Sequence, residues 1–454
     1  RLVSAAVDGG VGNAYAADAS ISADGRYVAF FSPASDLVTG DRNGHADIFV
    51  WHRETGRVEL ASIGSSGAQG NDASLESAVS ADGRFIAFTS FASNLARNDT
   101  NGRSDVFLRD RQGGYTERVS VASDGRQANG YSWQPCVSAD GRYVAFYSTA
   151  TNLVPNDRGS QADVFVRDRQ TRQTLRVSVA SDGSASNGYS VQPTLSGNGR
   201  YVAFVSDATN LVSGDTNGRI DVFVKDLEGG RVERVSVSSG GAQANGGSYE
   251  PALSADGRYV VFESLATNLV PGDTNASQDV FLHDRETGET RRVSVGTGGT
   301  QPDGANGTPS VSADGRYVAF RSDATNLAAG DDNRSADVYV KDLGPNDSGT
   351  IAFTIKPRAL DFGTRPVGSS TTQNFWLHNN SGTYLPIDGM ALRGADRGAF
   401  ALAHTCSTLV APDDGCRISV TFHPTTAGAK SAELKVYAGD AVRTRELTGV
   451  AASW

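Results

Sequence analysis

Cysteine, methionine and long apolar runs are all scarce in this chain. Only 3 of the 454 residues are cysteine and 1 is methionine, too few cysteines for a fold held by a disulfide network. No apolar stretch approaches the roughly 18 residues that a membrane-spanning helix needs, and the first residues do not form a signal-peptide pattern. These absences exclude a disulfide-rich miniprotein and a helical membrane protein, so we expect no membrane span.

Positive charge is also in short supply. Lysine and arginine number 41 against 51 aspartate and glutamate residues, which gives a net charge of -10. Because an acidic surface repels phosphate backbones, we exclude nucleic acid as a partner. Glycine is frequent, with 52 residues, and marks regularly spaced turns, which favours an all-β fold over disorder.

What the chain does contain is an internal repeat. A Ser-x-x-Gly-Arg turn followed by aromatic and apolar residues recurs every 58 residues, beginning at Ser22, Ser80, Ser138, Ser196, Ser254 and Ser312. Each copy predicts four short strands, which in the third copy cover residues 132–138, 142–148, 163–168 and 175–179. Six repeats of four strands predict a six-bladed β-propeller over residues 1–343.

The two ends of the repeat array predict how the ring closes. The last copy stops after residues 337–343 and lacks a fourth strand, whereas the opening of the chain aligns without a gap when Val3 is matched to Val119. We therefore predict that the N-terminal strand closes blade six, with Val3–Ala5 beside Val338–Lys341. Such closure would remove the free edge of an open array.

The repeat unit resembles the TolB-type propeller repeat through three segments, S-x-D-G-R-Y-V-A-F, D-V-F-V-x-D and R-V-S-V. The resemblance implies the fold but not TolB's partner binding, because the given chain has no preceding α/β domain and its second-to-third-strand loops are longer. A hydrolase domain of the prolyl-oligopeptidase class is also missing, and no G-x-S-x-G motif occurs.

A different pattern follows a predicted linker at 344–350. Residues 351–454 contain alternating short strands and the segments LDFG (360–363), VG (367–368), NNSG (379–382), FHP (422–424) and LTG (447–449). They resemble the choice-of-anchor-D or ASH-type immunoglobulin-like domain. The resemblance implies a β-sandwich that serves as a spacer or adhesion module on exported bacterial proteins.

The same resemblance bears on the cysteines. Cys406 and Cys416 lie where the bacterial form often carries a cysteine pair, which implies a disulfide and hence a periplasmic, cell-surface or secreted location. Free thiols are the alternative. We expect Cys136 to pack as a small buried hydrophobic residue on an inner strand.

Long polar loops predict where a ligand binds. Two connections in each repeat are long, and because strand direction alternates, both should emerge on one face, where binding concentrates. At the centre of this face the sequence places carboxylates, amides and aromatic rings, which are side chains that bind a sugar ring or the cationic end of a peptide. The alternative is that these polar side chains cap strand ends and hold water in the channel. The predicted channel-mouth residues are Asp18, Glu76, Gln134, Gln192, Glu250, Tyr131, Trp133, Tyr189 and Tyr249.

A second candidate site is an Asp-x-Asn-Gly-x-x-Asp loop. It overlaps part of a calcium-binding loop, although two carboxylates and an amide fall short of the roughly six to eight oxygens that calcium takes. The alternative is an Asx turn. The residues concerned are Asp41, Asn43 and Asp47, Asp99, Asn101 and Asp105, and Asp215, Asn217 and Asp221.

The sequence thus favours an exported bacterial binding or scaffold protein with a protein or glycan partner. The sandwich would be a spacer or attachment module, the protein could assemble with other exported proteins, and no cofactor beyond the calcium hypothesis is implied. The competing hypothesis is a carbohydrate-active lyase or hydrolase that uses Asp18, Glu76 or Glu250. No nucleophile motif or histidine cluster supports catalysis. We further expect Glu263 and Arg321, at one register position on adjacent blades, to form an ion pair.

Overall fold

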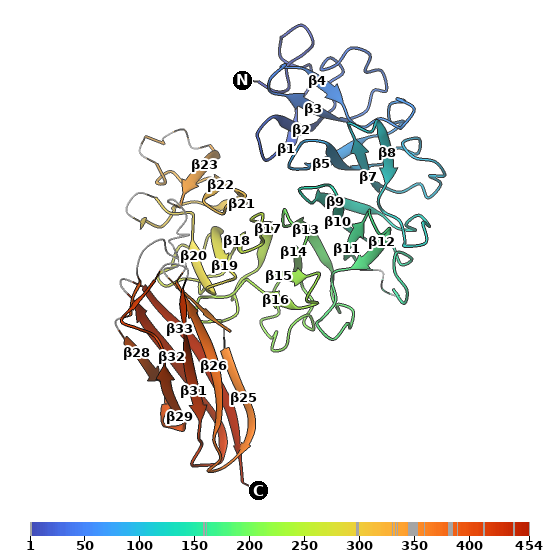
Figure 1. The fold of residues 1–454 in the computed structure, drawn as a ribbon. Helices are drawn as coiled ribbons and strands as arrows, with labels where there is room; N and C mark the ends of the chain where they lie inside the picture. Colours follow the sequence, from blue (N-terminus) through green and yellow to red (C-terminus); the bar gives the residue numbers. More distant parts are fainter. Residues whose placement is uncertain are drawn as a thin grey trace. The chain divides into compact units, whose positions relative to one another are not determined.

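The computed structural model divides the chain into two compact units, Arg1–Asp342 and Leu343–Trp454, coloured along the sequence in Figure 1. It describes residues 2–157, 159, 161–296, 299–328, 330–331, 333, 335–343, 353–357, 359–379, 385–387, 389–411, 414–438 and 441–453. The predicted linker at 344–350 lies outside the described residues. In the part of the chain that is described, no helix has the length and apolar character needed to cross a membrane.

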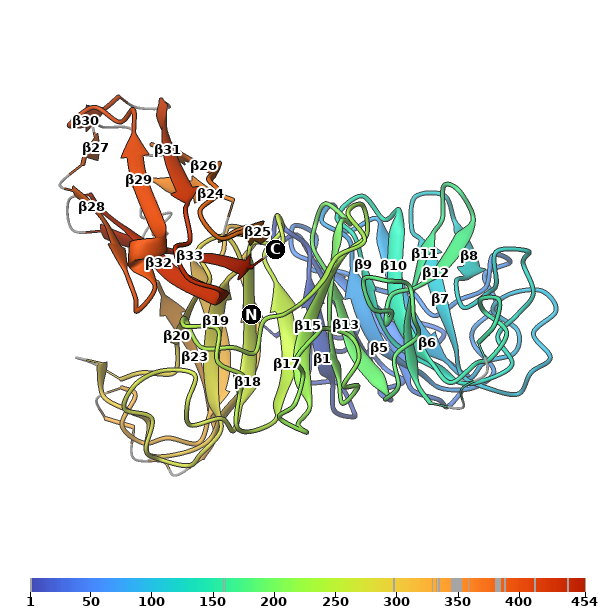
Figure 2. The same ribbon diagram turned by 90° about the horizontal axis from the view of Figure 1, so that it is seen from below.

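The first unit is a six-bladed β-propeller with one antiparallel sheet per repeat, as predicted. In five blades, four strands pair in chain order. Inner strands of consecutive blades contact one another, and β5, β9, β13 and β17 stand side by side in Figure 2. Blades one to three are β1 (Ala17–Ile21), β2 (Tyr27–Ser32), β3 (Asp47–His52), β4 (Val58–Leu60); β5 (Ser74–Val79), β6 (Phe85–Ser90), β7 (Asp105–Asp110), β8 (Tyr115–Arg118); and β9 (Ser132–Val137), β10 (Tyr143–Ser148), β11 (Asp163–Asp168), β12 (Gln173–Arg176).

The remaining blades follow the same order, except that the sixth has three strands. Their strands are β13 (Ser190–Leu195), β14 (Tyr201–Ser206), β15 (Asp221–Asp226), β16 (Val232–Arg234); β17 (Ser248–Leu253), β18 (Tyr259–Ser264), β19 (Asp279–Asp284), β20 (Glu289–Arg292); and β21 (Asn306–Val311), β22 (Tyr317–Ser322), β23 (Asp337–Asp342).

Third strands are apolar on both sides because a neighbouring blade covers each side. In β11, Val164 and Val166 pack with Val202 and Phe204 of the next blade. Phe165 belongs to the cluster shared with the preceding blade. Full burial of one such side chain stabilises the fold by roughly 1.5–3 kcal/mol, so these blade-to-blade clusters are the main core of the propeller.

The Ser-x-x-Gly-Arg turn connects the first and second strands of each blade, and its side chains fix that end of the sheet. Ser138 Oγ donates to Asp140 at 2.6 Å, and Gly141 adopts a φ of 71°, which glycine reaches without a steric cost. Arg142 then donates to both carboxylate oxygens of Asp168, at 3.1 and 2.7 Å. This pairing lowers the pKa of Asp168 to about 2. The turn therefore ties the second strand to the end of the third.

The predicted pairing of Val3–Ala5 with Val338–Lys341 is wrong. Ala5 instead bridges Val11 of its own repeat, as Val121 bridges Gln127 in the third. The alignment with Val119 does not explain this difference, because the Val119 N–H still donates to the carbonyl of Val106 on its third strand at 2.7 Å. In blade six the matched third strand is uncovered instead: Val338 and Val340 are 77% and 66% exposed, and β23 has no fourth strand beside it among the described residues.

The second unit is a β-sandwich of two four-stranded sheets, with a separate β27–β30 pair. Phe362, Phe400 and Phe422 meet in its core, with ring centres 5.0 to 5.8 Å apart. One sheet orders β24 (Thr354–Lys356), β26 (Thr371–His378), β31 (Gly415–Phe422) and β29 (Phe400–His404). The other orders β25 (Ala359–Pro366), β33 (Ala441–Ala452), β32 (Gly428–Ala438) and β28 (Gly389–Arg393). The remaining elements are β27 (Leu385–Pro386), β30 (Leu409–Val410) and the 3-10 helix η2 (Arg397–Ala399).

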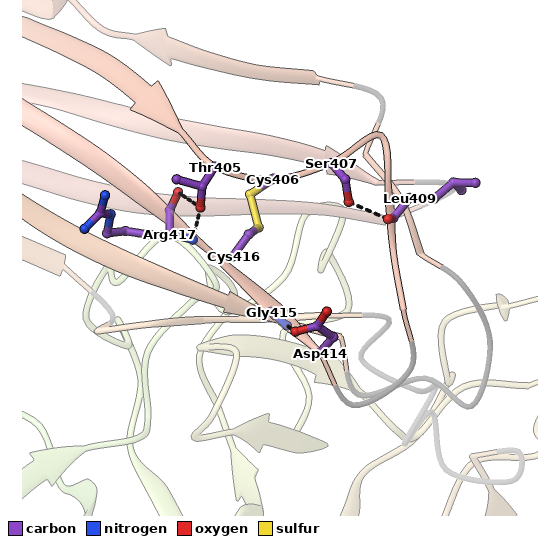
Figure 3. The surroundings of a disulfide bond; sticks show 8 residues. All are labelled: Thr405, Cys406, Ser407, Leu409, Asp414, Gly415, Cys416 and Arg417. Atoms are coloured by element: carbon purple, nitrogen blue, oxygen red, sulfur yellow. Dashed lines mark hydrogen bonds between the residues drawn. A yellow bond between two sulfur atoms is a disulfide. The ribbon is translucent and has the colours of Figure 1, made fainter.

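The disulfide implied by the family resemblance is confirmed. Cys406 and Cys416 are joined with an S–S distance of 1.96 Å, and Figure 3 shows the bond beside Arg417. Cys136 lies on inner strand β9, is half-buried and packs against the cluster between blades three and four. Burial raises the pKa of its thiol to about 12, so the thiol stays protonated.

Candidate binding site at the inner strands

Each inner strand contains one residue in the left-handed backbone region. The register slips at this position in each sheet, as between Leu75 and Ser77, which marks a β-bulge. A non-glycine residue there costs of order 1–3 kcal/mol, so the surrounding packing imposes the conformation. The six residues, with φ between 46° and 53°, are Asp18, Glu76, Gln134, Gln192, Glu250 and Thr308. We call these six residues the bulge ring.

The bulge ring joins neighbouring blades. Glu76 Oε2 accepts hydrogen bonds from the backbone N–H of Gln134 at 2.8 Å and from the hydroxyl of Thr89 at 3.0 Å. Gln192 Nε2 donates to Glu250 Oε1 at 2.5 Å, and the Glu250 N–H donates to Gln192 Oε1 at 3.2 Å. Four predicted site residues thus hold blades together. This structural use was the alternative to ligand binding.

Glu263 takes part in the same pattern, and its predicted ion pair with Arg321 is wrong. Glu263 Oε2 accepts the backbone N–H of Thr308 at 2.8 Å. Arg321 instead pairs with Asp323 at 2.7 Å. The Glu263 carboxylate on β18 therefore links blades five and six in the way that the Glu76 carboxylate links blades two and three. In both cases the backbone N–H of the bulge residue donates to a carboxylate of the preceding blade.

Burial and mutual repulsion set the electrostatics of the ring. Burial raises the pKa of Glu76, and the charge of Asp18 raises it further. Burial also raises the pKa of Glu250, with additional contributions from Glu263 and Asp18. Since Asp18 acts on both glutamates, carboxylates from blades one, two and five share one electrostatic environment.

The predicted aromatic residues divide into two groups. Tyr131 is exposed, and the Arg103 guanidinium lies 4.5 Å from its ring centre and donates to its hydroxyl. Trp133 is half-buried and meets Phe91 edge-on at 5.2 Å between ring centres. Both rings are therefore fixed by neighbours within the propeller.

Tyr189 directly precedes inner strand β13, and Tyr249 lies on the neighbouring inner strand β17. Burial raises the pKa of Tyr189, and both Asp207 and Tyr249 raise it further. Sequence reasoning missed Tyr147, which pairs with Trp133 across β9 and β10. Burial raises the pKa of Tyr147, and Glu76 adds to the shift. The 58-residue register, which aligns Tyr147 with Glu263, is the signal that could have identified it.

The two long loops of each repeat are tied together, which confirms that they share a face. In the fourth repeat the Asn187 N–H donates to Asn210 Oδ1 at 2.9 Å, and the Thr209 N–H donates to Asn187 Oδ1 at 2.8 Å. Asn210 Nδ2 also donates to the carbonyl of Ala185 at 2.7 Å. Much of the asparagine on this face thus stabilises the loops themselves.

The loops considered for calcium form Asx turns. Asn101 Oδ1 accepts the Arg103 N–H at 2.9 Å, and Asn101 Nδ2 donates to Asp105 at 2.9 Å. The guanidinium of Arg118 lies 3.4 Å from Asp99 and 3.8 Å from Asp105. The fourth repeat is alike, with Asn217 bonded to Asp221 and Arg234 paired with Asp215 and Asp221. A cation already neutralises these carboxylates, which disfavours calcium there.

The first repeat differs because Leu60 stands where Arg118 stands in the second. Asn43 still donates to Asp47 at 2.7 Å. Burial raises the pKa of Asp47 to about 6, and Asp41 adds to the shift. Nowhere in the described ranges do three or more histidine, cysteine, aspartate or glutamate side chains form a group able to hold a metal ion. Calcium binding stays a prediction, best tested in this repeat.

One family model matches the second unit. Residues 352–449 match the family model described as HYDIN/CFA65/VesB-like, Ig-like domain. No curated protein matches the chain. Among solved structures, putative TolB from Agrobacterium tumefaciens is 18% identical with a TM-score of 0.41, covering 73% of this chain and 91% of that one.

Two further solved structures are similar to part of the chain. The periplasmic gluconolactonase PpgL of Pseudomonas aeruginosa is 18% identical, with a TM-score of 0.33 and coverage of 72% of this chain and 88% of that one. The ASH/PapD-like domain 7 of human CEP192 is 18% identical, with a TM-score of 0.18 and coverage of 23% and 87%. The choice-of-anchor-D assignment stays a prediction. The chain joins a β-propeller unit to a unit that matches an immunoglobulin-like family model.

Proposed function

We propose that this chain is an exported, non-enzymatic binding protein whose bulge ring receives a positively charged group of a partner. The observation that supports this function is the set of acidic groups from blades one, two and five. Asp18 raises the pKa of both Glu76 and Glu250, and no cationic group contributes to either shift. Negative charge concentrated at one opening attracts an ammonium or guanidinium group.

The surrounding rings favour a peptide segment of a partner protein. Tyr249 lies on β17 and Tyr189 directly precedes β13, the strands that carry Glu250 and Gln192 of the bulge ring, and aromatic faces attract cations. The disulfide between Cys406 and Cys416 supports an oxidising, extracytoplasmic location. The immunoglobulin-like domain would then serve as a spacer or attachment module. A glycan partner is the second possibility to be tested, and catalysis has no supporting observation.

The test uses a pentalysine peptide as probe in isothermal titration calorimetry with the full chain. Changing Glu76→Gln together with Glu250→Gln removes two charges but keeps oxygens that can accept the bonds from Gln134 and Gln192. We expect peptide affinity to fall about tenfold or more, since each charge contact contributes roughly 1 kcal/mol. Affinity should also fall as salt is raised.

Glu54→Gln with Glu228→Gln is the matched control, because both side chains are exposed and lie away from the ring. It should bind the peptide like the parent. A neutral pentaglycine peptide should not bind. Equal binding by the ring variant and the parent would disprove the proposal. Product release from a glycan panel, lost in the ring variant, would instead establish the carbohydrate-active enzyme.

A further inference from the structure

One sheet of the sandwich contains no acidic residue. Its four strands β24, β26, β31 and β29 read TIK, TTQNFWLH, GCRISVTF and FALAH. The strands of the opposite sheet mix both signs of charge: they carry Asp361, Glu433 and Glu446 together with six lysine and arginine residues, Arg365, Arg393, Lys430, Lys435, Arg443 and Arg445. We call the solvent side of the first sheet the acid-free face. Lys356 and Arg417 give its strands positive charge with no acidic residue among them.

A tryptophan lies between two cations on this face. Trp376 of β26 pairs with Lys356 of β24 on one side and with Arg417 of β31 on the other. Directly paired residues project to the same side of a sheet at a spacing of about 5 Å. The Trp376 side chain is 59% exposed, so its indole is accessible between a lysine and an arginine.

Neighbouring bonds fix this row. The Arg417 N–H donates to Thr405 Oγ1 at 3.0 Å, and the Thr405 N–H donates to the Arg417 carbonyl at 2.9 Å. The adjoining Cys406–Cys416 disulfide holds the same two segments together, as Figure 3 shows. The backbone of Arg417 is therefore anchored on both sides, which preorganises the row for a ligand.

The rest of the face is polar or carries small side chains, such as Ala401 and Ala403 of β29. Ser419 Oγ donates to Asn374 Oδ1 at 2.7 Å, and the hydroxyls of Thr372 and Thr421 are bonded at 2.8 Å. Trp376 is the one large apolar side chain exposed on the described strands of this sheet. A protein interface needs an apolar core of several such side chains, whereas a sugar ring needs one aromatic platform and hydroxyl partners.

We propose that the acid-free face binds an acidic polysaccharide. The indole of Trp376 stacks on one pyranose ring, and Lys356 and Arg417 pair with carboxylate or sulfate groups on the sugars to either side. Arginine forms paired hydrogen bonds with such planar anions. This site lies on the immunoglobulin-like unit and does not depend on the function proposed for the bulge ring.

The experiment measures binding of the full chain to polygalacturonate and to heparin by affinity electrophoresis, with neutral dextran as the control polymer. Trp376→Ala should weaken binding to the acidic polymers about tenfold or more, because it removes the central contact. Trp376→Phe should restore part of that loss. Arg417→Gln should weaken binding severalfold, whereas Arg393→Gln on β28 changes net charge equally and should have no effect.

Three outcomes would overturn the proposal. The first is parent-like binding by Trp376→Ala. The second is equal affinity for dextran or no binding of either acidic polymer. The third is equal retention by polyglutamate, which would assign the face to acidic polypeptides. The Glu76→Gln, Glu250→Gln variant should keep polygalacturonate binding, so failure here is distinguishable from failure of the peptide test.

Discussion

Strands β11 and β23 have almost the same sequence, DVFVRD and DVYVKD, but different surroundings. All six residues of β11 are buried, whereas burial alternates along β23. Val164 and Val166 are 0% and 1% exposed, and the matched Val338 and Val340 are 77% and 66% exposed. The strand motif therefore specifies the strand but not its burial, which comes from the next blade and the fourth strand.

The largest effect should come from a charge placed on the covered strand. Val166→Asp buries an unpaired carboxylate, so we expect it to lower the free energy of unfolding by about 4 kcal/mol or more. The matched change Val340→Asp should cost less than about 1 kcal/mol, because that side chain is already in solvent. Urea unfolding of both variants measures the difference. An equal loss of unfolding free energy in both variants would show that β23 of blade six is covered in solution.

An intermediate loss of stability is expected when the Arg–Asp pairs of these two blades are broken, and the loss should differ between the two pairs. Arg142→Ala leaves the largely buried Asp168 without its two bonds, at an expected cost of about 2 kcal/mol. Arg316→Ala removes the matching bonds to Asp342, but these side chains are 32% and 46% exposed, so we expect less than about 1 kcal/mol. Thermal unfolding followed by circular dichroism compares the two. A larger loss for Arg316→Ala would contradict this ranking.

The smallest effect concerns acid sensitivity within one covered strand. Bonds from Arg84 lower the pKa of Asp110 to about 2, so its contribution exists above the ordinary value of 3.8 and is lost as pH falls toward 2. Burial raises the pKa of Asp105 to about 6, so its contribution exists below 3.8 and is lost as pH rises through 6.

Asp105→Asn should therefore reduce the stability lost between pH 4 and 6 by about 1 kcal/mol. Asp110→Asn should instead reduce the stability lost between pH 4 and 2. Unfolding free energies from urea titrations at several pH values distinguish these profiles. If Asp105→Asn alters only the limb below pH 4, the assignment of Asp105 is wrong.

The sequence predicted most of the propeller because the repeat supplies the same evidence six times. For the third copy, the predicted strand at 163–168 is β11 to the residue, and those at 132–138 and 142–148 differ from β9 and β10 by one residue each. The fourth was placed at 175–179 but β12 spans Gln173–Arg176. Val177 lies beyond the end of this strand but packs in the core between blades. Its apolar side chain therefore resembles the next residue of a strand in the sequence pattern.

The error about ring closure has another source, because pairing between the first and last repeats is not encoded within any single repeat, and the sixth sheet has three strands. In the candidate site, the register identified the bulge ring, but no residue type indicated its backbone, because none of the six is glycine. The roles of Glu263 and Tyr147 depend on contacts between second strands and neighbouring inner strands, which a local pattern does not contain. The predicted ligand role of the ring is still a prediction.

The repeated left-handed bulge has a consequence for how binding specificity could change over time. One backbone geometry accommodates Asp18, Glu76, Gln134 and Thr308 alike, with φ values of 46° to 52°. Blade packing, rather than side-chain identity, imposes this geometry. A single-codon change at Asp18 or Thr308, whose side chains take no part in the bonds between blades described above, can therefore alter the charge or size of the opening while those bonds stay intact, so new recognition properties are accessible without a new fold.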